Sequence, residues 1–138
     1  MHFRWTYFVG AFALSLSWTA SYAADNWVFV SDSVDPIASW NIYVNENTLS
    51  TTKIKGAPDQ TLVVWDELDQ QKDSNRGIYL RKAANCDHSG LVYREVPEYD
   101  HSYAPPYAFP QGTSGYAVWE HVCGWYNKRS IWNRLFGR

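Results

Sequence analysis

The sequence predicts an α+β fold: a single antiparallel β-sheet of about five or six strands, with a C-terminal helix packed on it and one disulfide. Three observations predict it. Between residues 27 and 96, apolar residues mostly recur at every second position, which is typical of half-buried strands. Turn residues separate these short runs, as in antiparallel sheets. After residue 113 the apolar spacing becomes helical, and the chain has only two cysteines.

The strands are expected in the following order. WVFV opens the sheet, and in WNIYVN the residues Trp40, Ile42 and Val44 alternate with their neighbours. NENT (45–48) predicts a turn, after which the polar run LSTTKIK suits an edge strand. The strongest strand is QTLVVWDEL, followed by a polar hairpin loop, DQQKDSN. The last two runs are RGIYLRKA and GLVYREV, on either side of Cys86.

Residues 98–115 predict a loop, because three prolines and several glycine or serine residues interrupt the pattern. This loop is a candidate binding loop through four aromatic residues, Tyr99, Tyr103, Tyr107 and Phe109. Two interpretations stay open. The aromatic side chains cover an edge of the sheet, or they form a recognition surface of the kind that extended Tyr-rich segments provide.

The helix is predicted from apolar residues spaced i, i+3, i+4, i+7, namely Tyr116, Trp119, Val122, Cys123 and Tyr126. Thr113 or Ser114 can cap its start. Gly124 stands where a glycine often ends a helix. We therefore expect a helix that ends near Gly124.

The N-terminus predicts a signal peptide over residues 1–23. Arg4 precedes a short apolar run, and small residues at Ser21 and Ala23 have the spacing of a cleavage site. A retained membrane anchor is the alternative, but a spanning helix needs about 20 apolar residues. The expected location is the periplasm, the outer-membrane surface or the medium. The mature chain then suits one domain over 24–124, with a basic, aromatic tail over 125–138.

Charge is unevenly distributed in the mature chain. Residues 24–127 hold fourteen acidic and seven basic residues, whereas residues 128–138 hold four basic residues and no acidic one. An acidic body of this kind excludes a nucleic-acid binder by overall charge. The basic tail is the part that could meet a negatively charged partner.

The two cysteines occur in mirrored sequences, CDH at Cys86 and HVC at Cys123. Paired strands would place both cysteines with His88 and His121 on one face, as a zinc site requires. On a helix, however, His121 and Cys123 point about 200° apart. The helical pattern therefore favours a structural disulfide, the usual state in an exported protein. A metal site and free or intermolecular thiols remain the alternatives.

The order of these motifs resembles the surface-adhesin protein E-like family. The resemblance spans about Trp27 to Cys123 and rests on WVFV, WNIYVN, TLVVWDEL, AANCDHSG and FPQGTSGYAVWEHVC. It implies an antiparallel sheet with a packed helix, tied by a disulfide between Cys86 and Cys123. It also implies an exported protein of Gram-negative bacteria. The founding member binds host matrix and serum proteins, whereas the tail after Cys123 and the absence of a lipid-anchor cysteine depart from the family pattern.

No catalytic motif, cofactor-binding motif or metal-binding motif is evident. The chain lacks Gly-x-Ser-x-Gly, His-Glu-x-x-His and a glycine-rich phosphate loop. In DELD, Glu67 and Asp69 would share one side of a strand and could do acid–base work. A charged hairpin end is the favoured interpretation. His88 and His101 are expected to be solvated. An enzyme would instead require perturbed titratable groups that converge in a pocket.

The tail GWYNKRSIWNRLFGR combines basic and aromatic residues. Ser130 could cap a short helix with Ile131 and three further apolar residues on one face: Trp132, Leu135 and Phe136. Four cations would flank that face: Lys128, Arg129, Arg134 and Arg138. Such a segment suits peripheral contact with an anionic membrane. Alternatively, the aromatic residues dock on the sheet while the cations pair with the acidic body.

These observations favour a non-enzymatic exported binding domain that contacts host or envelope macromolecules in the manner of an adhesin. The expected partner is a protein ligand, with no cofactor and no nucleic acid. The alternative is a periplasmic accessory protein or an inhibitor acting on a cell-envelope enzyme.

Overall fold

The computed structural model describes residues 25–34, 39–99 and 102–136. The predicted signal peptide lies outside these residues. The elements in chain order are β1 (Trp27–Val34), β2 (Ser39–Ile54), β3 (Ala57–Gln71), β4 (Gly77–Asn85), β5 (Leu91–Val96), the 3₁₀ turn η1 (Pro97–Tyr99), β6 (Ser102–Tyr103), β7 (Tyr107–Ala108) and α2 (Ser114–Phe136).

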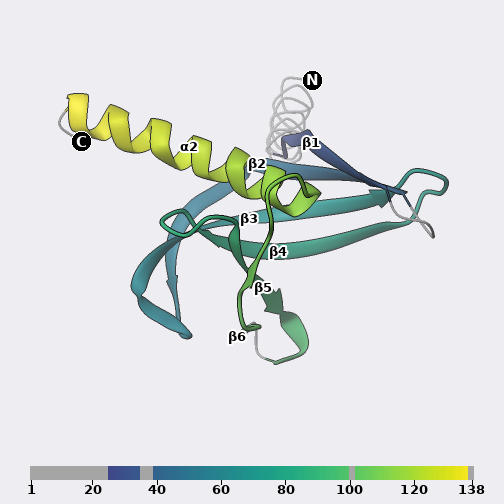
Figure 1. Ribbon diagram of the computed structural model, residues 1–138, viewed down its shortest axis with the longest axis horizontal. Helices are drawn as coiled ribbons and strands as arrows, with labels where there is room; N and C mark the ends of the chain where they lie inside the picture. Colours follow the sequence, from purple (N-terminus) through teal and green to yellow (C-terminus); the bar gives the residue numbers. More distant parts are fainter. Residues whose placement is uncertain (1–24, 35–38, 100–101, 137–138) are drawn as a thin grey trace, which may run out of the picture.

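The strands form one antiparallel sheet in the order β1-β2-β3-β4-β5-β6, with β7 also paired to β5. Each long strand thus pairs with its neighbour in the sequence. The helix α2 crosses one face of this sheet (Figure 1). The predicted fold class is confirmed: an antiparallel sheet, a C-terminal helix packed on it, and a disulfide.

The predicted turn at 45–48 is wrong, because β2 continues through it as a bulge. The register with β3 shifts between Asn45 and Ser50. Polar side chains satisfy the displaced backbone there: Asn47 N donates to Asn45 Oδ1 (3.2 Å), and Asp66 N donates to Thr48 Oγ1 (2.8 Å). Residues 50–54 pair with β3 as a continuation of β2. Among the described residues the pairing of β2 with β1 ends at Asn45, so this run lies at an edge of the sheet, as predicted, but within a longer strand.

The main core lies between the sheet and α2. Trp65 of β3 is fully buried at its centre, beside Val44 and Val122. A second buried cluster lies on the opposite face of the sheet and contains Ile54, Ala57, Leu62, Ala83 and Tyr93. β3 contributes to both clusters, because consecutive residues from Leu62 to Trp65 are buried on the two faces of the strand.

The helix begins as predicted but ends twelve residues beyond Gly124. Thr113 Oγ1 accepts a hydrogen bond from Tyr116 N (3.2 Å), which caps the first turn. The predicted end at Gly124 is wrong, since α2 runs without interruption to Phe136. Gly124 is not among the positive-φ glycines, Gly90 and Gly112, so it lacks the left-handed backbone of a helix-ending glycine. Ser130 likewise lies inside the helix and caps nothing.

Candidate binding surfaces

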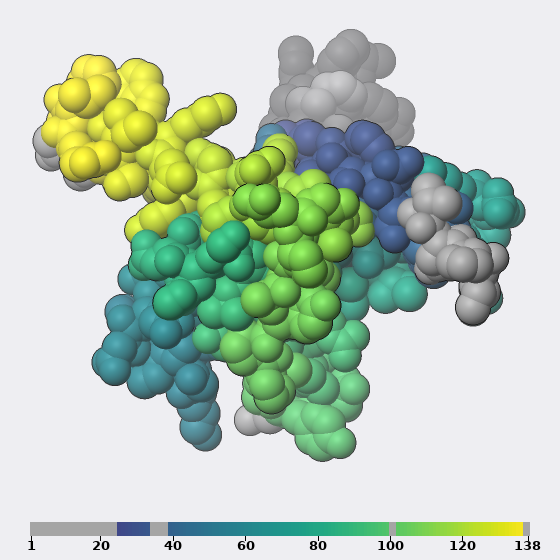
Figure 2. All heavy atoms as spheres, in the orientation of Figure 1, coloured from purple at the N-terminus to yellow at the C-terminus, as the bar shows by residue number. Residues whose placement is uncertain are grey.

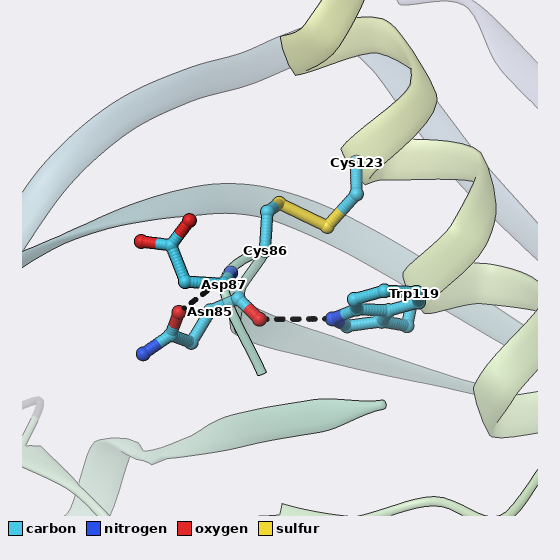
Figure 3. Close-up of a disulfide and its surroundings, with 5 residues drawn as sticks. All are labelled: Asn85, Cys86, Asp87, Trp119 and Cys123. Atoms are coloured by element: carbon cyan, nitrogen blue, oxygen red, sulfur yellow. Dashed lines mark hydrogen bonds between the residues drawn. A yellow bond between two sulfur atoms is a disulfide. The ribbon is translucent and has the colours of Figure 1, made fainter. Parts of the chain in front are cut away.

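Cys86 and Cys123 form a disulfide that joins the turn after β4 to α2, with Cα atoms 5.5 Å apart (Figure 3). A hydrogen bond supports it from one helical turn away: Trp119 Nε1 donates to Asn85 O (3.0 Å). Asn85 Oδ1 in turn accepts from Asp87 N (2.9 Å), which fixes the turn that carries Cys86. The disulfide interpretation of the cysteine pair is therefore correct.

The mirrored histidines do not join the cysteines. His121 Nε2 lies 2.8 Å from Glu46 Oε2, on the side of α2 toward β2. His88 is exposed in the turn between β4 and β5. Within the described part of the chain, no group of three or more His, Cys, Asp or Glu side chains could hold a metal ion.

The four aromatic residues of the predicted binding loop divide into two pairs. Tyr103 packs on the second core cluster, and Phe109 packs on the main core beneath Gly115. Tyr99 and Tyr107 are exposed. Tyr103 and Phe109 therefore cover the sheet, as the first interpretation has it, whereas a recognition surface formed by the exposed Tyr99 and Tyr107 stays a prediction.

Tyr99 and Tyr103 line an open groove of about 860 Å³ on the sheet, together with Lys53, Lys55 and Arg81. Burial raises the pKa of the Tyr103 hydroxyl, and the charge of Glu95 raises it further. The exposed Tyr107 lies outside this groove, edge-on to Phe109 with ring centroids 4.8 Å apart. The predicted loop residues therefore do not form one continuous surface.

Glu67 and Asp69 do not form the charged hairpin end expected from the sequence. Glu67 is only 1% exposed. Its Oε2 lies 2.8 Å from Lys82 Nζ, and its Oε1 accepts a hydrogen bond from Trp65 Nε1 (3.2 Å). Asp66 pairs with Arg81 at 3.0 Å and is far more exposed. The helix-facing side of the sheet thus carries a carboxylate on β3 and its counter-ion on β4.

Asp69 is the perturbed member of this cluster. Burial raises its pKa to about 8, with further contributions from a hydrogen bond with Glu67 and from the negative charge of Glu67. Asp69 Oδ1 is buried and has no donor in reach among the described residues. Asp69 is therefore a neutral acid at pH 7 and shares its proton with Glu67. Such a group could exchange protons near neutral pH.

The carboxyl pair lines a pocket of about 220 Å³ between the sheet and the start of α2. Its walls are largely apolar and include Trp40, Ile78 and Phe109. Sequence reasoning placed Glu67 and Asp69 on one side of a strand but missed that this side faces the helix. Asp69, whose pKa is raised, lines this pocket beside Glu67 and Lys82.

The C-terminal end of α2 reaches past the sheet (Figures 1 and 2), and the last ten residues of the helix, 127–136, are named here the projecting end. Three large side chains on it are strongly exposed: Trp132 at 63%, Leu135 at 72% and Phe136 at 60%. The rings of Trp132 and Phe136 stack on each other, with centroids 4.4 Å apart. The alternative that these aromatic residues dock on the sheet is therefore wrong.

Three cations of the predicted tail, Lys128, Arg129 and Arg134, lie on the projecting end and are exposed, whereas the fourth, Arg138, lies outside the described residues. Arg129 Cζ lies 5.5 Å from the centroid of the Trp125 ring. No helix among the described residues has the length and apolar character needed to cross a membrane.

In the part of the chain that the structure describes, the fold is a small disulfide-tied antiparallel sheet, covered on one face by α2, which reaches past the sheet. Comparison with protein-family models, with curated proteins and with solved structures finds no match for this chain. The resemblance to the surface-adhesin protein E-like family accordingly stays a prediction.

Proposed function

We propose that this protein is an exported, non-enzymatic binding domain that contacts a macromolecular partner of the cell envelope or the host through the projecting end of α2. The single observation that carries the proposal is the exposure of Trp132, Leu135 and Phe136 on a helix that leaves its own sheet. Large apolar side chains gathered in this way mark interaction sites. Aromatic residues and arginine are also the residues enriched where binding energy concentrates.

The acidic body makes the projecting end distinct in charge as well as in shape. Residues 121–136 contain no acidic residue, whereas they contain Lys128, Arg129 and Arg134. A positive, apolar segment on an otherwise acidic protein suits a partner whose surface is negative. Electrostatic complementarity of this kind speeds association and discriminates between partners.

The buried carboxyl pair is better explained as part of the core than as a catalytic site. Glu67 is committed to Lys82 and Trp65, and Asp69 shares its proton with Glu67. A general acid or base needs a free position toward its substrate. The resemblance to an adhesin family also supports binding in place of catalysis.

The proposal is tested by co-sedimentation of the exported chain with Gram-negative cell envelopes. The variant Trp132→Ser/Phe136→Ser should bind at least tenfold less tightly, since both side chains are exposed and their removal leaves the core intact. The matched control is Phe29→Ser/Tyr79→Ser, which removes two aromatic side chains of similar exposure from the sheet. Equal binding by the two variants would reject the projecting end as the binding element.

A third variant, Tyr99→Ser/Tyr107→Ser, tests the loop. Loss of binding in this variant alone would move the binding surface to residues 99–109 and would also contradict the proposal. Intact disulfide and unchanged circular dichroism are required of every variant, so that a folding defect is not taken for a binding defect.

A further inference from the structure

The sheet-facing stripe of α2 becomes polar in the second half of the helix. In the first half the buried residues are Val118, Val122 and Cys123. At about 100° per residue, the same stripe continues through Ser130 and Asn133. These two residues line a pocket of about 170 Å³ with Thr51 and Thr61. The second half of α2 therefore turns polar atoms toward the sheet.

The apolar residues of the projecting end lie on a different side of the helix. Ile131, Trp132, Leu135 and Phe136 centre about 140° around the axis from the sheet-facing stripe. All four are exposed. Because all four side chains are exposed, this apolar face has no partner among the described residues.

Cations border this apolar face on three sides. By the same helical geometry, Lys128 lies one turn before Trp132, so it borders the face at its N-terminal end, in line with the middle of the face. Arg129 and Arg134 lie along its two edges. An apolar strip with basic margins is the pattern of helices that lie in the plane of a membrane surface.

We propose that the projecting end of α2 docks on the surface of an anionic lipid bilayer. The inference rests on the proposed function and names its partner. Trp132, Leu135 and Phe136 would enter the boundary between headgroups and acyl chains, while the cations stay among the lipid phosphates. Charge complementarity selects this occupant, because a purely apolar partner would leave three cations without a counter-charge.

Glu46 and Glu120, which line a groove with Lys128 at the base of the projecting end, do not oppose this docking. Glu120, the last acidic residue in the sequence, lies about 12 Å along the helix axis from Lys128. That separation exceeds the Debye length of about 8 Å at physiological salt. Glu46, which lines the same groove as Glu120, is already paired with His121 at 2.8 Å. The outermost part of α2 protrudes from the rest of the molecule (Figure 2), while Arg129, Ser130 and Asn133 line a pocket with Thr51 and Thr61 of the sheet.

The test is sedimentation of the exported chain with vesicles of equimolar phosphatidylglycerol and phosphatidylcholine, compared with vesicles of phosphatidylcholine alone. Binding to the anionic vesicles should be at least tenfold tighter and should weaken as salt is added. Lys128→Gln/Arg129→Gln/Arg134→Gln should bind the anionic vesicles about a hundredfold more weakly than the parent does, which is about fivefold for each cation removed. Lys53→Gln/Lys55→Gln is the matched control on the sheet and should bind as the parent does. All chains must carry the same N-terminus.

Trp132→Ser/Leu135→Ser/Phe136→Ser should lose binding to both kinds of vesicle, since it removes the inserted side chains. Equal binding to the two lipid compositions, or binding that the control also loses, would overturn the inference. If the protein binds whole envelopes through the projecting end but does not bind vesicles, the inference of a lipid partner is rejected and the proposed function is retained. If the protein does not bind envelopes either, both the lipid inference and the proposed function are rejected.

A second copy of the chain is the competing occupant, because the acidic body could receive the basic helix. Sedimentation velocity across a range of protein concentrations detects that outcome. A dimer that the triple serine variant abolishes, in the absence of any lipid binding, would replace the membrane with a partner subunit and overturn the inference.

Discussion

Asp69 shows how burial and one neighbouring charge set the protonation of a side chain. An isolated aspartate ionises near pH 3.8, but beside Glu67 and beneath the helix its pKa rises to about 8. Lys82 neutralises Glu67 at 2.8 Å. With Asp69 protonated, the cluster has no net charge at pH 7, which is the arrangement that a largely apolar pocket tolerates best.

This cluster makes stability depend on pH. Between pH 4 and pH 8 the unfolded chain ionises Asp69 and the folded chain does not, so the free energy of unfolding falls as pH rises through this range. Below pH 4 and above pH 8 the residue contributes no slope. Because the carboxyl is partly exposed, solvent screening limits the expected decrease in the free energy of unfolding between pH 4 and pH 8 to about 2 kcal/mol.

Asp69→Asn removes the ionisation and should raise the free energy of unfolding by about 2 kcal/mol at pH 8, with little change at pH 4. Urea unfolding at a series of pH values measures the difference. Asp66→Asn, which alters an exposed residue of the same strand, should keep the slope of the parent chain. A slope that survives in Asp69→Asn would show that this carboxyl ionises normally.

The cysteine pair was predictable from the sequence, whereas the burial of Glu67 and Asp69 was not. In a chain predicted to be exported, a pair of cysteines favours a disulfide over a metal site or free thiols. In β3, by contrast, Leu62, Val63, Val64 and Trp65 are all buried. Since both faces of the strand are apolar there, alternation shows which residues share a face but not which face meets the helix.

At the scale of elements, the strand pattern was predictable and the continuity of two elements was not. NENT has the composition of a turn, but the Asn45 and Thr48 side chains bind backbone atoms locally and keep β2 paired to β3. Gly124 resembles a helix end, but the disulfide at Cys123 and the packing of Trp125 and Tyr126 hold the chain on either side of it. In both cases tertiary contacts override a local signal.

The variant Gly124→Ala distinguishes a helix that ends at Gly124 from one that continues through it to Phe136. An added Cβ meets nothing within 4 Å, and alanine in a helix interior is favoured over glycine by about 1 kcal/mol. We expect the free energy of unfolding to rise by about 0.5–1 kcal/mol. At a true helix-ending glycine with positive φ, the same change would destabilise the protein.

Gly115→Ala is the opposing control in the same helix. An added Cβ there collides with the ring of Phe109, so this variant should lose about 1–3 kcal/mol. Both values follow from urea unfolding monitored by circular dichroism. A loss of stability in Gly124→Ala comparable to that in Gly115→Ala would contradict a continuous helix through residue 124.

At the scale of the whole molecule, α2 packs on a sheet whose strands pair mainly with their neighbours in the sequence. Only the first half of α2 is packed, and its buried residues end at Cys123. The disulfide therefore lies where the helix leaves the core, and it ties that point to the turn after β4. This arrangement leaves Trp132, Leu135 and Phe136 of the projecting end exposed, while the helix is fixed covalently at Cys123.

Removal of the disulfide should consequently weaken the whole fold. The bond closes a loop between residues 37 positions apart, which constrains the unfolded chain by roughly 4 kcal/mol in the loop-entropy model. A domain of this size has a total stability of about 5–15 kcal/mol, so the loss is a large share. Cys86→Ser/Cys123→Ser should lower the free energy of unfolding by about 4 kcal/mol and lower the midpoint of thermal unfolding accordingly.

Urea unfolding of the oxidised parent, the reduced parent and the double serine variant measures this loss. The reduced parent is the matched control, because it keeps both sulfur atoms and lacks only the bond. The two disulfide-free forms should agree, and in both the helix should lose its hold on the turn after β4 before the sheet unfolds. Hydrogen exchange should then rise first in residues 119–136. A loss below about 1 kcal/mol would mean that packing of Val118 and Val122 alone anchors α2, and that the bond is not what sets the base of the projecting end.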